Sequence, residues 1–170
     1  MELKLLGAIL IVAGCGGYGF SLCTRYRKRE RALSDLVRAL DRMECELQYR
    51  LTPLPELCRQ TAAESGGRIR EVFTSLAGEL ENQVSPEVRS CMNAALCRVR
   101  ELPERAKKEL LELGQTLGRF DLPGQLKGLE AIRRNCRSEL DELSRNREVR
   151  LRSYQTLGLC AGAALAILFL

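Results

Sequence analysis

The sequence contains no histidine and no tryptophan, and aromatic residues make up only 5% of it. Histidine is the commonest general base and metal ligand, so its absence argues against most hydrolase and metalloenzyme sites. The shortage of aromatic side chains argues against nucleic-acid binding by base stacking. Neither a GK[ST] phosphate loop nor a CxxC pair occurs. We therefore expect a protein that is not an enzyme and that uses no cofactor, no metal and no nucleic acid.

Charged side chains are missing from long stretches at both ends of the chain. Residues 5–24 and 153–170 contain no Asp, Glu, Lys or Arg. A run of about 20 apolar residues, rising ~1.5 Å each in a helix, matches the ~30 Å hydrocarbon core of a membrane. We expect an N-terminal transmembrane helix in residues 1–24, a soluble domain in residues 25–152 and a C-terminal transmembrane helix in residues 153–170.

Basic residues flank both apolar runs on the side of the soluble domain. Four arginines precede the second run, at positions 145, 147, 150 and 152. Five basic residues follow the first run, namely Arg25, Arg27, Lys28, Arg29 and Arg31. The positive-inside rule then places the soluble domain in the cytoplasm. The cluster from Arg25 to Arg31 is also a candidate contact for anionic lipid headgroups, although a role in setting the membrane topology explains it equally well.

Two patterns inside the apolar runs leave alternatives open. Gly158 and Gly162 form a GxxxG pair, so the spans could pack on each other or on partners, including further copies of the chain. The stretch from Val12 to Cys15 matches a bacterial lipoprotein cleavage box, after which Cys15 would carry lipid and the remainder would lie outside the cytoplasm. The uninterrupted apolar run to Cys23 and the second span argue against lipidation.

Apolar residues in the soluble domain recur with helical spacing. The first helix, residues 30–50, carries a stripe with alternating steps of three and four, formed by Leu33, Leu36, Leu40, Met43 and Leu47. Breaks and caps separate five further helices, which we place at 56–65, at 68–83, from Pro86 with Ser85 as its cap, from Pro103, and after an Asp121 cap. No stretch alternates as a strand does. The sequence predicts an all-α fold with a compact six-helix bundle between the two membrane helices.

The eight cysteines and the acidic clusters have simple structural interpretations. Because the cysteines are scattered and form no metal-ligand spacing, we expect small buried side chains in a reducing compartment. We interpret Glu44 with Glu46, and Glu139 with Asp141 and Glu142, as solvated charges on helix surfaces.

Several segments resemble stage III sporulation protein AB of endospore-forming bacteria. They are the start Lys4–Ile11, the helix Leu40–Tyr49 leading into Thr52-Pro53-Leu54, the C-terminal Leu157-Gly158-x-x-Ala161-Gly162, and a stretch from Leu113 to Gln125. That last stretch is close to the family pattern LGxxLGxxDxxxQ. The chain departs from the family in Gly14-Cys15-Gly16-Gly17, in its many arginines and in its many cysteines.

The resemblance implies a role in the complex that joins the mother cell to the engulfed forespore. The soluble part of this family resembles the helical domain of the F protein of type II secretion and type IV pilus machines, an inner-membrane platform. This chain would then be a scaffold in the mother-cell membrane that meets other sporulation channel proteins, including a secretion-type ATPase, on the cytoplasmic side. A membrane-anchored signalling or receptor-like helical module is the alternative.

The LGxxLGxxDxxxQ stretch is the candidate partner-binding surface. Its residues are Leu113, Gly114, Leu117, Gly118, Asp121 and Gln125. Glycines four apart let a second element approach closely, and Asp121 and Gln125 share a helical face that could bond to a partner. The same residues also fit a structural interpretation, with Gly114 packed inside the bundle, Gly118 ending a helix and Asp121 capping the next.

Overall fold

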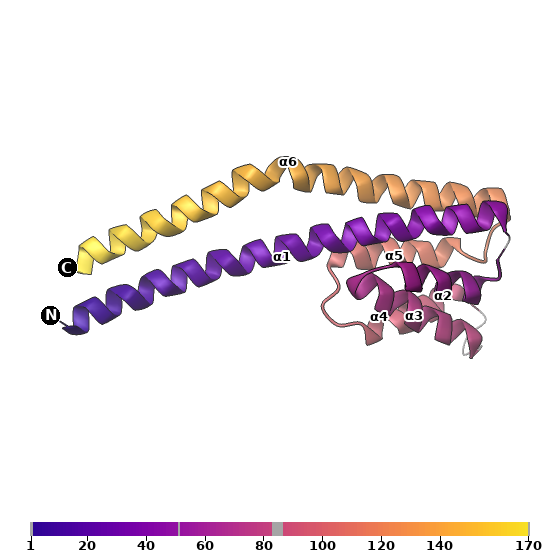
Figure 1. The fold of residues 1–170 in the computed structure, drawn as a ribbon, viewed down its shortest axis with the longest axis horizontal. Coiled ribbons are helices and arrows are strands. Elements are labelled where there is room, and N and C mark those ends of the chain that lie inside the picture. The colour runs from indigo at the N-terminus through magenta and orange to yellow at the C-terminus, as the bar shows by residue number, and fades with distance from the viewer. Residues whose placement is uncertain (1, 51, 83–86, 170) are drawn as a thin grey trace. The chain divides into compact units, whose positions relative to one another are not determined.

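Helices make up almost all of the described chain. The computed structural model describes the backbone of residues 2–50, 52–82 and 87–169, and the side chains of residues 24–50, 52–82, 87–145 and 156. Its six helices are α1 (Glu2–Tyr49), α2 (Leu54–Glu64), α3 (Gly67–Glu81), α4 (Val88–Arg98), α5 (Glu104–Thr116) and α6 (Leu122–Phe169) (Figure 1). No strand occurs in the described ranges, which confirms the all-α prediction.

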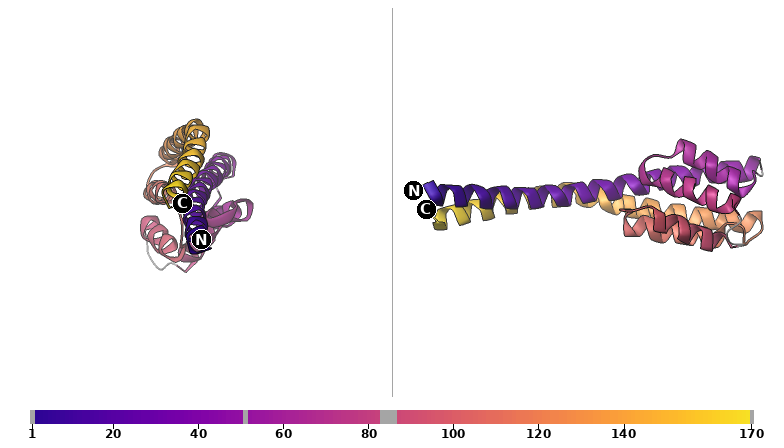
Figure 2. Two further views of the ribbon diagram at one scale, coloured as in Figure 1. Left: turned by 90° about the vertical axis from the view of Figure 1, so that its left-hand side faces the viewer. Right: turned by 90° about the horizontal axis from the view of Figure 1, so that it is seen from below.

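The chain divides into two units. Unit 1 comprises Met1–Lys28 and Asp141–Leu170, which are the first part of α1 and the last part of α6. Those two helical segments run side by side (Figures 1 and 2), and the Tyr26 hydroxyl donates a hydrogen bond of 2.9 Å to the carbonyl of Leu143. Unit 2, Arg29–Leu140, contains the rest of α1 and α6 together with α2 to α5, of which each helix contacts the next.

The predicted membrane spans fall on residues that the structure describes only in part. Apart from Thr24 and Thr156, residues 5–24 and 153–170 lie outside the residues with described side chains, as does Cys15. Within the described residues, no helix combines the length and the apolar character that crossing a membrane requires.

The apolar stripe of α1 forms one wall of the core of unit 2. Leu33, Leu36, Leu40 and Met43 are at most 1% exposed, as the spacing of three and four predicts. The other helices contribute Leu57, Ile69, Phe73, Leu76, Met92, Leu110 and Leu113, which are completely buried. Burial of each such side chain stabilises the fold by about 1.5–3 kcal/mol, so the core accounts for most of the driving force for folding.

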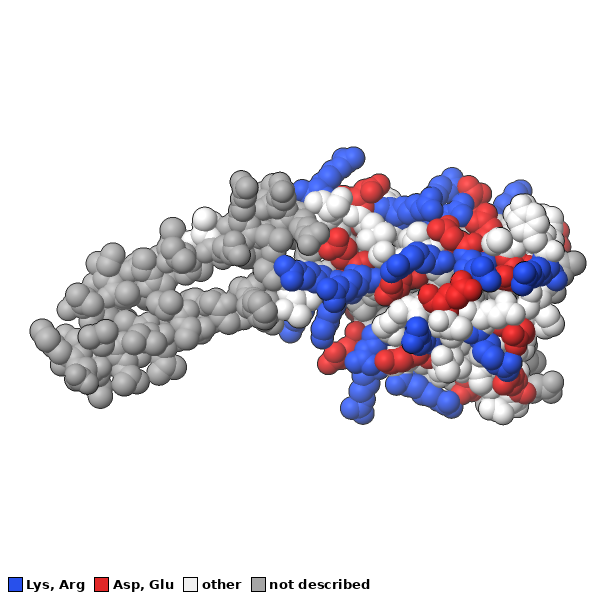
Figure 3. Space-filling view, in the orientation of Figure 1, with Lys and Arg blue, Asp and Glu red and all other residues white. Residues whose placement is uncertain are grey.

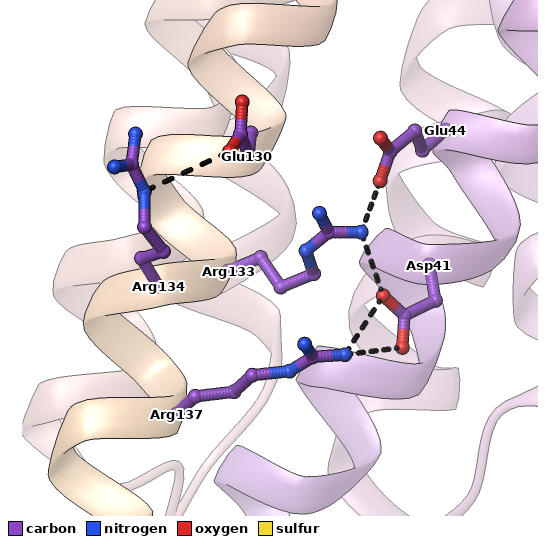
Figure 4. A network of polar contacts seen from close by, with 6 residues as sticks. All are labelled: Asp41, Glu44, Glu130, Arg133, Arg134 and Arg137. Carbon is purple, nitrogen blue, oxygen red and sulfur yellow. Dashed lines mark hydrogen bonds and ion pairs between the residues drawn. The ribbon is translucent and has the colours of Figure 1, made fainter.

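Ion pairs connect α1 to α6 along the edge of this core (Figure 4). Arg133 on α6 lies 3.0 Å from Oδ1 of Asp41 and also pairs with Glu44, while Arg137 lies 3.3 Å from Oδ2 of Asp41. These α1 carboxylates are partly buried, so the pairs are less screened than isolated surface pairs. Elsewhere on the visible face of unit 2, acidic and basic side chains are interspersed (Figure 3).

Several sequence expectations need correction. Glu46 is 3% exposed rather than solvated, because Arg42 and Arg50 extend to its carboxylate at 3.0 and 3.8 Å. Glu139 is half-buried, and it pairs with Arg29 and Arg105. Glu44 is partly buried against Arg133, as described above. Helical periodicity alone places acidic residues on the surface. It misses those that arginines accompany into the interior, from the same helix for Glu46 and from neighbouring helices for Glu44 and Glu139.

The starts of two helices also differ from expectation. α4 begins at Val88 with Glu87 as its N-cap, whereas the sequence predicted Ser85 as the cap and Pro86 as the first helical residue, and both of these lie outside the described residues. Pro103 is the N-cap of α5 rather than its first residue. Proline fixes φ near −65° both at the cap and in the first turn, so the sequence alone leaves a shift of one residue undecided.

The cysteines are divided between the core and the surface. Cys58, Cys91 and Cys136 are buried, as expected, whereas Cys45 and Cys97 are exposed, and none of these five forms a disulfide. Burial raises the pKa of both Cys58 and Cys136 to about 12, so these two thiols stay protonated at neutral pH. Cys15, Cys23 and Cys160 lie outside the described side chains.

One buried carboxylate lacks a full set of partners. Glu109 on α5 is 6% exposed, and its Oε2 atom has no hydrogen-bond donor. Desolvation and then the neighbouring charge of Glu112 raise its pKa above 4.5, while a hydrogen bond from Asn135 and the charges of Lys108 and Arg105 oppose this rise. The folded state therefore binds more protons than the unfolded state as pH rises above 4.5.

Replacing Glu109 by glutamine should increase stability at neutral pH. The native protein loses stability as pH rises from the unfolded pKa of Glu109 through its raised folded pKa, because ionisation leaves a poorly solvated charge. Glu109→Gln keeps the shape without the charge and should gain about 1–2 kcal/mol at pH 7. Chemical unfolding at several pH values checks this, and an unchanged pH dependence in the variant would contradict it.

Candidate partner-binding site

A groove lies in unit 2 where the start of α4 meets the end of α5. It has a volume of about 320 Å³. Its walls come from two segments, Glu87, Val88 and Arg89 on one side and Gly114, Gln115, Leu117, Gly118 and Arg119 on the other. The second segment belongs to the LGxxLGxxDxxxQ stretch, so the structure brings part of the candidate surface to a concave site.

Glycine is required at two positions of this groove. A Cβ atom on Gly114 would lie 2.7 Å from Cβ of Met92, so α4 approaches α5 at van der Waals distance from its backbone. Gly118 has φ of +73°, the left-handed conformation that commonly ends a helix, and it follows the C-cap Leu117. The shape of the groove therefore depends on both glycines, as the structural interpretation of this stretch expects.

The two polar residues of the stretch hold the turn before α6. The amide of Gly124 donates a hydrogen bond of 3.2 Å to Oδ1 of Asp121, so Asp121 is the N-cap of α6, as predicted. The side-chain amide of Gln125 donates to the carbonyl of Phe120 at 2.8 Å. Both side chains thus bond to their own turn, and binding of a partner by them stays a prediction.

The six candidate residues fall into groups with different roles. Leu113 and Leu117 are buried, with 0 and 1% exposure, and anchor the end of α5 in the core. Gly114, Leu117 and Gly118 line the groove. Asp121 and Gln125 hold the turn before α6 and do not line the groove.

Sequence reasoning missed the residues that make this site available to a partner. Phe120 is 52% exposed, and the guanidinium of Arg119 lies 5.8 Å from the centre of its ring. Arg89 comes from α4 and is exposed. An aromatic residue directly before a helix-capping aspartate was a usable signal for an exposed turn, whereas the approach of α4 requires the tertiary structure.

The predicted lipid-binding cluster on α1 is exposed at four of its five residues. Arg25, Arg27, Lys28 and Arg31 are exposed. Arg29 is half-buried and pairs with Glu139. Four of the five side chains are therefore accessible to a headgroup, and lipid binding by this cluster stays a prediction. In the described residues, no group of three or more Cys, Asp or Glu side chains could hold a metal ion.

Comparison with known proteins identifies the family. The family model of stage III sporulation protein AB matches residues 4–170. Stage III sporulation protein AB of Bacillus subtilis (strain 168) is 26% identical over 171 residues, covering 99% of each chain. A solved structure of stage III sporulation protein AB is similar in fold, with a TM-score of 0.64 and 21% identity over 72% of this chain and 98% of that one. The chain belongs to the stage III sporulation protein AB family.

Proposed function

We propose that this protein is a non-enzymatic membrane platform of the sporulation complex. Residues 5–24 and 153–170 anchor it in the mother-cell membrane, and residues 25–152 form its cytoplasmic domain. The family match along nearly the whole chain carries the proposal. The uncharged ends of the sequence and their basic flanks support the anchoring and the orientation.

The platform meets a secretion-type ATPase through the groove between α4 and α5. A concave site of about 320 Å³ offers a place for an anchoring side chain. Next to the groove, Phe120 and Arg119 are of residue types that contribute much of the binding energy at protein interfaces.

Arg25, Arg27, Lys28 and Arg31 contact anionic headgroups at the membrane surface, each adding about 1 kcal/mol.

Reporter fusions and a deletion test the platform. Alkaline phosphatase fused after Arg145 should be inactive and a fluorescent protein fused there should fluoresce, because both would lie in the cytoplasm. Deletion of the gene should stop spore development after engulfment and leave vegetative growth normal. An active phosphatase would favour a lipoprotein attached through Cys15, and a growth defect with normal spores would contradict the sporulation role.

A further inference from the structure

The groove at the α4–α5 junction combines an apolar floor with a basic rim. Val88 and Leu117 are the aliphatic side chains of its lining. Arg89 and Arg119 stand on opposite walls, and both are exposed. Neither guanidinium forms an ion pair with any residue in the described part of the chain.

This lack of acidic partners is unusual among the arginines of unit 2. Most of the others pair with a carboxylate, for example Arg42 with Glu46, Arg98 with Glu79 and Arg133 with Asp41. Of the residues that line the groove, Glu87 alone is acidic, against two arginines. The rim therefore keeps a positive potential, whereas carboxylates neutralise most arginines elsewhere in unit 2. A positive concave site attracts a negative ligand.

The apolar part of the site requires a second property of that ligand. Phe120 exposes 52% of its surface beside Arg119 and is, with Tyr49, one of the two large apolar side chains that are exposed among the described residues. An exposed aromatic ring next to a groove floored by aliphatic groups favours a ligand that buries an apolar side chain there.

We propose that the groove binds an acidic, apolar protein segment, in which carboxylates face Arg89 and Arg119 and a large apolar side chain enters between Val88 and Leu117. This rests on the proposed function, in which the bundle meets a cytoplasmic protein, and it adds the chemistry of the segment that is recognised. Gly114 and Gly118 let α4 lie close to the end of α5 and so set the width of the groove. Phe120 is exposed at the α5–α6 turn, next to Arg119.

The test uses the full chain in phosphatidylcholine nanodiscs and measures fluorescence anisotropy of labelled peptides. The probe is a short amphipathic peptide of Glu, Ala and Leu. Two matched peptides carry Lys in place of Glu, or Ser in place of Leu. The Glu/Leu peptide should bind, added salt should weaken its binding, and each matched peptide should bind about tenfold more weakly or not at all.

Charge variants locate the binding. Arg89→Gln with Arg119→Gln should weaken binding of the Glu/Leu peptide about tenfold. Lys107→Gln with Lys127→Gln removes the same charge from exposed residues outside the groove and should leave binding unchanged. Equal binding of the Glu and Lys peptides, or equal effects of the two double variants, would overturn the inference. Arginine-dependent binding of phosphatidylglycerol vesicles without peptide binding would overturn it in favour of a lipid surface.

The inference and the proposed function can fail separately. If a crosslinker in the groove captures the sporulation ATPase but the protein binds no acidic peptide, the proposed platform function stands and the acidic-segment inference is overturned. Selective binding of the acidic peptide without capture of the ATPase would support the inference and contradict the proposed ATPase contact.

Discussion

Replacing Gly114 by alanine should lower the free energy of unfolding by about 2 kcal/mol, the opposite of what alanine does in most helices. Alanine is favoured over glycine in a helix interior by about 1 kcal/mol. Here the added methyl would lie 2.7 Å from Cβ of Met92 and 3.5 Å from Cα of Arg89. Those atoms move only with the α4 backbone, and overpacking of this kind costs about 1–3 kcal/mol or more.

Gly78 on α3 provides the matched control. A Cβ atom there would meet nothing within 4 Å, so Gly78→Ala should raise stability by about 0.5–1 kcal/mol. Thermal or chemical unfolding of both variants of the full chain, in one detergent, checks the pair. Stabilisation by Gly114→Ala would mean that α4 and α5 pack more loosely than described and that the groove lacks its close glycine contact.

Replacing Gly128 by alanine should also cost about 2 kcal/mol, because Gly128 of α6 lies directly against Thr116 of α5. A Cβ atom on Gly128 would overlap Cγ2 of Thr116 and lie 3.2 Å from Cβ of the same residue. Overpacking again outweighs the gain in helix propensity. The site was missed in the sequence because a single glycine within a helix carries no signal of what faces it.

A second substitution separates the clash from a general defect. Thr116→Ser removes Cγ2 and keeps the hydroxyl, which donates to the carbonyl of Glu112 at 3.1 Å. In a double-mutant cycle measured by chemical unfolding, Gly128→Ala should therefore cost much less in the Thr116→Ser background than in the native protein. Strict additivity of the two effects would show that Thr116 is not the obstacle.

Local sequence patterns predict the helices of this protein well, and their contacts poorly. The stripe of Leu33, Leu36 and Leu40 is buried because helical periodicity places these residues on one face. Asp121 caps α6 as expected because a cap bonds within its own turn. Both features depend on residues a few positions apart, which a single sequence displays.

Features that join distant segments escaped prediction. Glu139 of α6 is half-buried beside Arg29 of α1 and Arg105 of α5, and Glu109 of α5 accepts a hydrogen bond from Asn135 of α6. The groove exists because α4 packs closely on α5 at Gly114, a contact between residues about 20 positions apart in sequence that no local pattern records. Part of the LGxxLGxxDxxxQ stretch lines the groove, but its polar residues hold a turn while Arg89 and Arg119 stand on the groove walls.

The most direct measurement of the platform is photocrosslinking from the groove during sporulation. Gln115 is exposed and lines the groove, so a benzophenone residue can replace it without removing the cap bonds of Asp121 or Gln125. Ser138, exposed on α6 outside the groove, is the control position. The account predicts that mass spectrometry finds the sporulation ATPase captured from position 115 and not from 138. Capture of only a second copy of the chain, or equal capture from both positions, would contradict a platform that meets the ATPase through this groove.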